Sequence, residues 1–144
     1  MYLAIARRHA ANPDDWPFAP RFDPLRRWYH RLAEEPGAEV WLLTWLPGQE
    51  TDLHDHGGSA GAFVVVRGQL VEHTIDPSGT LRPTTLVTAA GRSFGPHHIH
   101  QLGNASSEPA VSVHVYAPAL TTMTRYRFDE GLRVAAVDRA GVQW

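Results

Sequence analysis

Short runs of β-branched and aromatic residues, bounded by turn-forming residues, dominate the middle of the sequence. Val40–Leu46 reads VWLLTWL, Ala62–Arg67 reads AFVVVR, and Gln69–Ile75 and Ala110–Tyr116 have the same character. Glycine, proline, aspartate or asparagine bound each run, for example Pro47–Gly48. Short strands separated by regular turn signals are typical of a β-sandwich or barrel. The sequence therefore predicts a mainly all-β protein.

One short helix is expected before the first strand, after about 20 irregular residues. Asp23 is a good N-cap and Pro24 suits the first helical position. Apolar residues then recur at the i, i+3, i+4, i+7 spacing of a helix face, at Leu25, Trp28, Tyr29 and Leu32. Pro36–Gly37 would end this helix.

The composition is that of a single globular domain. Of the 144 residues, 43% are hydrophobic and 19% are charged. We expect an N-terminal helical segment at residues 1–36, a β-barrel at 37–128 and a C-terminal tail at 129–144. A net charge of -2 does not indicate nucleic acid or an anionic membrane as a partner.

The sequence also predicts a cytoplasmic protein. No apolar run approaches the roughly 20 residues that span a membrane. Arg7 and Arg8 are not followed by the apolar stretch of a secretory signal.

Histidine is the unusual residue of this sequence, which contains nine histidines and no cysteine. The absence of cysteine excludes disulfides and thiolate metal sites. His54 and His56 flank Asp55, and residues i and i+2 of a strand point to the same face. A third histidine from another strand could complete a facial metal site with open positions; the candidates are His97, His98 and His100.

The spacing around these histidines resembles the two motifs of the cupin superfamily. Five residues separate Gly48 from His54 in the first motif. In the second, His100 is followed by three residues and then by Asn104, which favours His100 over the two neighbouring histidines.

The first motif departs from the cupin pattern at Gly61, which six residues separate from Gly68. In that superfamily a glutamate ligand often stands at this position. The departure implies a site of three histidines rather than three histidines and one glutamate. We also expect the glycine to leave space for a substrate that chelates the metal through two atoms.

Longer stretches resemble the cysteine dioxygenase family of thiol dioxygenases. They are YHR at Tyr29–Arg31, WLPGQETDLHDHGGSAGAF at Trp45–Phe63, HQLGN from His100, and EPAVSVHVYAP ending at Pro118. The resemblance implies a cupin-type β-barrel, or jelly roll, with one Fe(II) per chain. It further implies that the protein oxidises the thiol of L-cysteine with O2 to a sulfinic acid.

The resemblance also implies roles for individual residues. The iron ligands would be His54, His56 and His100. A hydrogen-bonded network beside the iron would comprise Ser112, His114 and Tyr116, which share one face of a strand at i, i+2 and i+4.

Arg31 takes the place of the arginine that binds the substrate carboxylate, and Tyr29 that of a neighbouring tyrosine. Arg67 and Arg92 are other candidates for the carboxylate partner. Some family members link the active-site tyrosine to a cysteine, but Gly61 stands where that cysteine would be. The sequence therefore resembles the bacterial branch without the cross-link.

Two other functions remain open at this stage. One is a dioxygenase for another small thiol such as 3-mercaptopropionate, and the other is a non-catalytic cupin that binds a metal. The branch that prefers 3-mercaptopropionate usually carries glutamine where Arg31 stands, so the resemblance favours cysteine.

Overall fold

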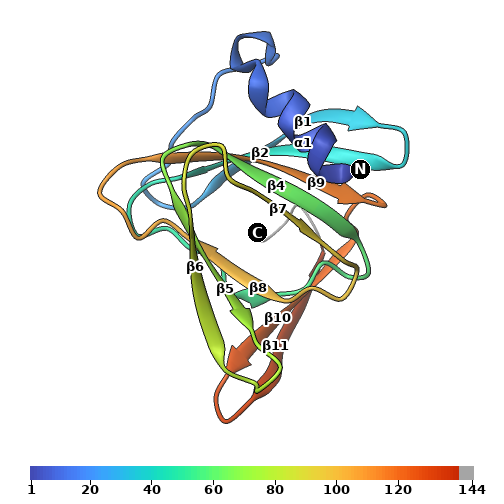
Figure 1. Cartoon of the computed structure of the whole chain (residues 1–144), viewed down its shortest axis with the longest axis vertical. Helices are drawn as coiled ribbons and strands as arrows, with labels where there is room; N and C mark the ends of the chain where they lie inside the picture. Colours follow the sequence, from blue (N-terminus) through green and yellow to red (C-terminus); the bar gives the residue numbers. More distant parts are fainter. Residues whose placement is uncertain (140–144) are drawn as a thin grey trace.

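Two antiparallel sheets face each other in the computed structural model, which describes residues 1–139 (Figure 1). In sheet order, the first consists of β1 (Trp28–Glu35), β2 (Ala38–Trp45), β9 (Ala110–Ala117), β4 (Ala60–Arg67) and β7 (Gly91–Phe94). The second consists of β11 (Leu132–Arg139), β10 (Thr122–Phe128), β3 (Leu53–His54), β8 (His100–Gly103), β5 (Leu70–Ile75) and β6 (Leu81–Leu86). This architecture confirms the predicted fold class, a mainly β protein with a short N-terminal helix.

β9 lies at the centre of the first sheet, and all eight of its residues are buried. Its side chains alternate between the two faces, as in any strand. The outward-facing valines belong to a core between this sheet and the N-terminal helix; they are Val111, Val113 and Val115. The residues between them, Ser112, His114 and Tyr116, face the barrel interior. One strand thus supplies both apolar packing and a polar interior surface.

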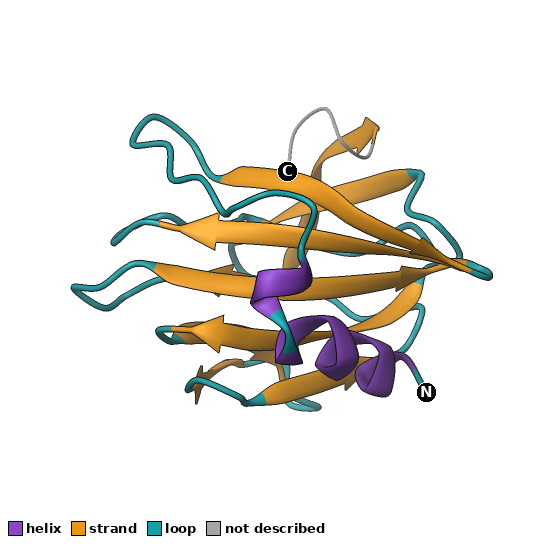
Figure 2. Cartoon of the chain, turned by 90° about the horizontal axis from the view of Figure 1, so that it is seen from above, coloured by secondary structure: helices purple, strands orange, loops and turns teal. Residues whose placement is uncertain are grey.

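The helix α1 (Tyr2–Ala11) covers the outer face of the first sheet (Figure 2). Leu3, Ala6 and Ala10 follow a helical spacing and pack into the outer core, where Ala6 is fully buried. A one-turn 3₁₀ helix at Pro13–Asp15 follows. The expectation of about 20 irregular residues is therefore wrong for this segment.

The predicted helix after residue 23 is also wrong, because β1 occupies most of it. Trp28 and Leu32 pack into the outer core, whereas Tyr29 packs against the core inside the barrel. Side chains of adjacent residues point to opposite layers in a strand but not in a helix. Leu25, counted as part of the helix face, is 92% exposed.

The predicted C-terminal tail is partly a strand. Residues 132–139 form β11 at the edge of the second sheet, paired with β10. Residues 140–144 of the predicted tail lie outside the described residues.

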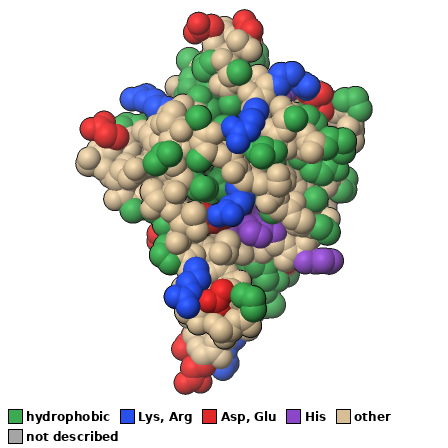
Figure 3. Space-filling model, in the orientation of Figure 1, with side chains coloured by type: hydrophobic (Ala, Val, Ile, Leu, Met, Phe, Trp, Pro, Cys, Tyr) green, Lys and Arg blue, Asp and Glu red, His purple; other side chains and the backbone are tan. Residues whose placement is uncertain are grey.

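No helix among the described residues is long and apolar enough to cross a membrane. On the face drawn in Figure 3, acidic and basic side chains are interspersed with apolar ones rather than gathered into a region of one charge.

Candidate active site

Three imidazole rings meet inside the barrel. His54 ends β3 and His100 begins β8, and the sheet register pairs these two residues directly. His56 lies two residues beyond β3. The three ring centroids are 4.9, 4.8 and 4.9 Å apart, and one ligand atom from each ring lies within 4.8 Å of the others. The structure therefore brings together the three histidines that the sequence motifs single out.

Asp55 fixes the turn that carries His56 inward. One carboxylate oxygen accepts hydrogen bonds from the backbone N–H of Gly57 at 3.1 Å and of Thr124 at 2.9 Å. The other accepts from the Tyr126 hydroxyl at 2.8 Å. These bonds tie the turn to β10 and leave the residue before and the residue after Asp55 facing the interior.

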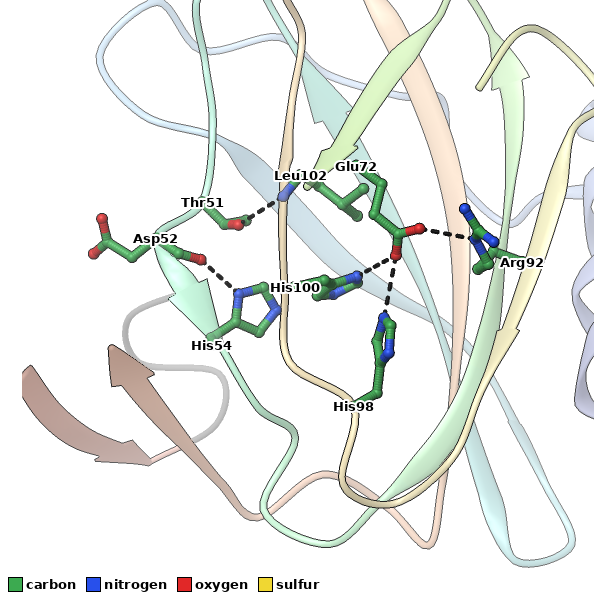
Figure 4. A network of polar contacts seen from close by, with 8 residues as sticks. All are labelled: Thr51, Asp52, His54, Glu72, Arg92, His98, His100 and Leu102. Carbon is green, nitrogen blue, oxygen red and sulfur yellow. Dashed lines mark hydrogen bonds and ion pairs between the residues drawn. The ribbon is translucent and has the colours of Figure 1, made fainter. Parts of the chain in front are cut away.

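Hydrogen bonds determine which ring nitrogens carry a proton and which present a lone pair. His54 Nδ1 lies 2.8 Å from the Asp52 carbonyl oxygen, and His100 Nδ1 lies 2.7 Å from Glu72 Oε2 (Figure 4). Both oxygens can only accept, so each Nδ1 carries the proton and each Nε2 presents a lone pair. Neither ring nitrogen of His56 has a hydrogen-bond partner among the described residues, although both are buried.

The three rings are in the protonation state that binds metals. Burial is the largest cause that lowers the pKa of His54, His56 and His100. Repulsion from the neighbouring rings adds to the pKa shift at His54 and His56, whereas Glu72 opposes it at His100. Metal ligation requires neutral imidazole. Buried, neutral and partly unpartnered nitrogens that converge on one point fit a divalent metal ion with nitrogen ligands.

The space beside His56 excludes a fourth ligand from position 61. A Cβ atom built on Gly61 would lie 1.9 Å from the Val115 carbonyl oxygen and 2.8 Å from Cζ of Phe94. A longer side chain would therefore need a backbone shift. The Phe94 ring stacks on His56 with a centroid distance of 4.6 Å. The expected free space at Gly61 is thus filled by an aromatic ring.

A cavity of about 440 Å³ reaches the histidines from one side. Its lining includes His54, His100, His114 and Tyr116, together with Arg27. Two of the three converging histidines, a phenol and a cation therefore border the same space. A pocket of this size can hold a small molecule.

A hydrogen-bonded network backs one wall of the cavity. The Trp45 indole N–H donates to the Ser112 hydroxyl at 2.8 Å, and this hydroxyl lies 2.7 Å from His114 Nε2. The indole can only donate, so the Ser112 hydroxyl accepts this bond and connects Trp45 to the His114 ring. Burial lowers the pKa of His114 to about 3, so the ring is neutral.

Tyr116 completes the inward face of β9. Its ring centroid is 5.5 Å from that of His56 and 6.3 Å from that of His114. Burial raises the pKa of the phenol, while the positive charge of Arg27 acts in the opposite direction. The hydroxyl therefore remains protonated and can donate a hydrogen bond into the cavity.

The guanidinium that lines the cavity belongs to Arg27, immediately before β1. It lies over the Trp45 ring, 5.4 Å from the centroid. Burial lowers the pKa of Arg27, and the neighbouring Tyr116, Tyr29 and Asp52 oppose that shift. An arginine nevertheless remains charged near neutral pH.

Arg31, the residue expected to bind a carboxylate, lies outside the cavity. Its side chain is 51% exposed and forms ion pairs with Glu34 at 2.9 Å and Glu39 at 3.2 Å. In the pairing of β1 with β2, Arg31 lies opposite Trp41, whereas Trp45, which lines the cavity, is at the end of β2. The expectation that Arg31 lies in the binding cavity is therefore wrong, and the arginine that lines the cavity is Arg27.

Tyr29 is half-buried behind the cavity lining, with its ring centroid 6.2 Å from that of Trp41. The two other candidate arginines have different partners. Arg67 lies over the Phe22 ring, and Arg92 is paired with Glu72.

The two histidines that compete with His100 in the sequence are not part of the three-ring cluster, although His98 lies beside it. His97 is exposed. His98 is half-buried, stacks on Phe94 and lies 3.2 Å from Glu72 Oε2.

Comparison with known proteins identifies the family. The family model described as cysteine dioxygenase type I matches residues 2–130. The chain belongs to this family.

Curated relatives of this cysteine dioxygenase family member include vertebrate enzymes named cysteine dioxygenase type 1. The zebrafish (Danio rerio) protein is 28% identical over 127 residues, which cover 79% of this chain and 62% of the relative. The rat (Rattus norvegicus) protein is 26% identical over 140 residues, which cover 88% and 68% of the two chains. The match thus spans less than two thirds of the zebrafish protein.

Solved structures support the fold of this family member. A conserved Klebsiella pneumoniae protein with a double-stranded β-helix domain aligns with a TM-score of 0.60 and 22% identity. The alignment covers 81% of this chain and 90% of that one.

Sequence reasoning missed three residues at the site of this cysteine dioxygenase family member: Arg27, Trp45 as a hydrogen-bond donor, and Glu72. A strand reading of residues 28–35 would have placed Arg27 next to β2. Glu72 follows Leu70 at the period of two along β5, so both face the interior. That alternation was the available signal for a buried carboxylate.

The first prediction concerns metal retention. Replacing His54, His56 or His100 by alanine removes a converging nitrogen, so each variant should bind Co(II) far more weakly than the wild type. The loss should exceed the roughly 10–100-fold typical of losing only a ligand's hydrogen-bond partner. Bound cobalt is measured after anaerobic gel filtration. His97→Ala, in the same part of the sequence but exposed, should retain wild-type binding; loss of binding in this control alone would contradict the ligand assignment.

Proposed function

We propose that this protein is an iron-dependent thiol dioxygenase that converts L-cysteine and O2 to cysteine sulfinic acid. The carrying observation is that two of the three converging histidines, His54 and His100, and the half-buried Arg27 line one cavity. A thiol carboxylic acid has the two groups that such a cavity would recognise. Membership of the cysteine dioxygenase family supports the same reaction.

The reaction balances without a further reductant. A thiol R–SH and O2 give the sulfinic acid R–SO2H, so both oxygen atoms end on sulfur and sulfur supplies the electrons. Fe(II) held by His54, His56 and His100 would supply thiolate coordination and the activation of O2. Three neutral ligands leave the full charge of the ion to attract an anionic thiolate.

Arg27 would hold the substrate carboxylate. A planar guanidinium matches a carboxylate with two parallel hydrogen bonds. Its position over the Trp45 ring restricts the orientation of the fork before substrate arrives. Less side-chain entropy would therefore be lost when the guanidinium binds the carboxylate.

Tyr116 would donate a hydrogen bond to the reacting oxygens or to the carboxylate. Its phenol remains protonated because burial raises its pKa. His114 sits two residues earlier on the same face, and its ring is fixed by Ser112. The inward face of β9 would therefore present polar side chains whose orientation is already fixed.

The second prediction tests the substrate. In anaerobically Fe(II)-loaded protein, O2 uptake should be fastest with cysteine, slower with 3-mercaptopropionate, which lacks the amine, and slowest with cysteamine, which lacks the carboxylate. The measurement is kcat/KM for each thiol with an oxygen electrode and product analysis. A faster rate with 3-mercaptopropionate would overturn the choice of cysteine. Iron binding without O2 uptake for any thiol would instead favour a non-catalytic cupin.

The third prediction concerns Arg27. Arg27→Gln removes a charge-assisted bond of about 1.5–3 kcal/mol, so kcat/KM for cysteine should fall by roughly 10–100-fold. Cysteamine should be much less affected, because it has no carboxylate. Arg31→Gln is the matched control and should behave as wild type. A large loss in Arg31→Gln with none in Arg27→Gln would reverse the assignment.

The fourth prediction concerns the Tyr116 hydroxyl. Tyr116→Phe should keep metal and thiol binding but slow turnover, by up to about 10²–10⁴-fold if the hydroxyl acts in proton transfer. Stopped-flow turnover of the iron-loaded variant measures the effect. Tyr2→Phe removes a hydroxyl from α1 on the outer face and should leave the rate unchanged. Wild-type turnover by Tyr116→Phe would exclude a role for the hydroxyl.

A further inference from the structure

Glu72 is a carboxylate with no exposed surface on the inner face of β5. Three side chains surround it (Figure 4): Arg92 Nε lies 2.8 Å from Oε1, while His98 Nε2 and His100 Nδ1 lie 3.2 and 2.7 Å from Oε2. A buried charge is tolerated only when it is paired and hydrogen-bonded. All three partners come from β7, from β8 or from the residues between these strands.

The bond to His100 is the one with consequences for the site. The ionised carboxylate can only accept, so it holds the proton on His100 Nδ1 and selects the tautomer whose Nε2 faces His54 and His56. Bonds between an ionised group and a ring N–H are shorter and stronger than neutral ones. Rotation of the ring, or a tautomer with the proton on Nε2, would break this contact.

The three histidines differ in the hydrogen-bond partners of their ring nitrogens. His54 donates to a neutral backbone carbonyl, that of Asp52, at 2.8 Å. Neither nitrogen of His56 has a hydrogen-bond partner in the described part of the chain, and the Phe94 ring stacks on it. His100 is therefore the one of the three that is backed by an anion. A carboxylate behind an imidazole raises its basicity as a ligand.

Arg92 holds the carboxylate in this position. It comes from β7 in the first sheet, whereas Glu72 comes from β5 in the second, so the ion pair ties the two sheets together behind the site. Glu72, His98 and His100 also have ligand atoms within 4.8 Å of one another. A cation among them would have to displace both Arg92 and the Nδ1 proton, so this cluster is better suited to orient a ligand than to hold a second metal.

We propose that Glu72, held by Arg92, is a positioning residue that fixes the tautomer of His100 and strengthens it as a metal ligand. This inference rests on the proposed metal site but not on the identity of the thiol. It predicts that Glu72 controls metal affinity even though it does not touch the metal or the cavity.

The test is the affinity of the purified protein for Co(II), measured by competition with a chelator. Glu72→Gln keeps the size of the side chain but removes the charge, so affinity should fall by about 10–100-fold. Asp76→Asn is the matched control: this carboxylate lies in the turn after β5, pairs with Arg82 at 2.8 Å, and should not affect metal binding when removed. Unchanged affinity in a folded Glu72→Gln protein would overturn the proposal.

A second measurement separates positioning from simple structural support, and its first part uses the wild-type protein. The proton NMR spectrum of the Co(II)-loaded wild type should contain a strongly shifted, slowly exchanging signal from His100 Nδ1–H, assigned with ring-labelled histidine. In Glu72→Gln this signal should move or exchange faster, while that of His54 stays in place. An unprotonated His100 Nδ1 in the wild type would overturn the proposal.

Failure of the two proposals can be distinguished. A wild type that binds Co(II) tightly, is weakened by Glu72→Gln, and oxidises no thiol when loaded with Fe(II) would overturn the dioxygenase function and support the role of Glu72. Thiol oxidation together with unchanged cobalt affinity in Glu72→Gln would do the reverse.

Discussion

The burial of three imidazole rings with converging nitrogens is the constraint on which the rest of this structure depends. Burying three basic groups together is tolerable only if all are neutral, and burial lowers each pKa accordingly. Neutral rings must still satisfy their polar atoms. The Asp52 carbonyl and Glu72 do so for one nitrogen each of His54 and His100, and the remaining nitrogens are left facing one another. A divalent metal with nitrogen ligands fits this arrangement.

The barrel provides the rigid frame for this cluster through strand alternation. β9 separates an apolar layer, packed under α1, from the polar inner face that carries His114 and Tyr116. The two sheets bring together residues that are far apart in the sequence, such as His54 on β3 and Tyr116 on β9. Because the site is built on strands and on a turn pinned by Asp55, its geometry is largely fixed before substrate binds.

Much of this arrangement is predictable because the strand period of two is strong in the sequence. It identifies β9, the shared face of its polar residues, and the pairing of His54 with His56. The N-terminal third is harder, because Trp28, Tyr29 and Leu32 fit both a helix face and a strand with two buried sides. Arg31 is assigned through the resemblance at Tyr29–Arg31, and the observed strand places its side chain outside the cavity. Glu72 escaped notice because a charged residue in a strand ordinarily faces water, although its alternation with Leu70 along β5 places both on the inner face.

The central claim is that His54, His56 and His100 hold one metal ion at the cavity that Arg27 lines. Anomalous diffraction at the iron edge, from crystals of protein loaded anaerobically with Fe(II), tests it most directly. The account predicts a single strong peak within bonding distance of Nε2 of His54 and of His100 and of a ring nitrogen of His56. A peak between Glu72 and His98, or no peak among the three histidines, would contradict it.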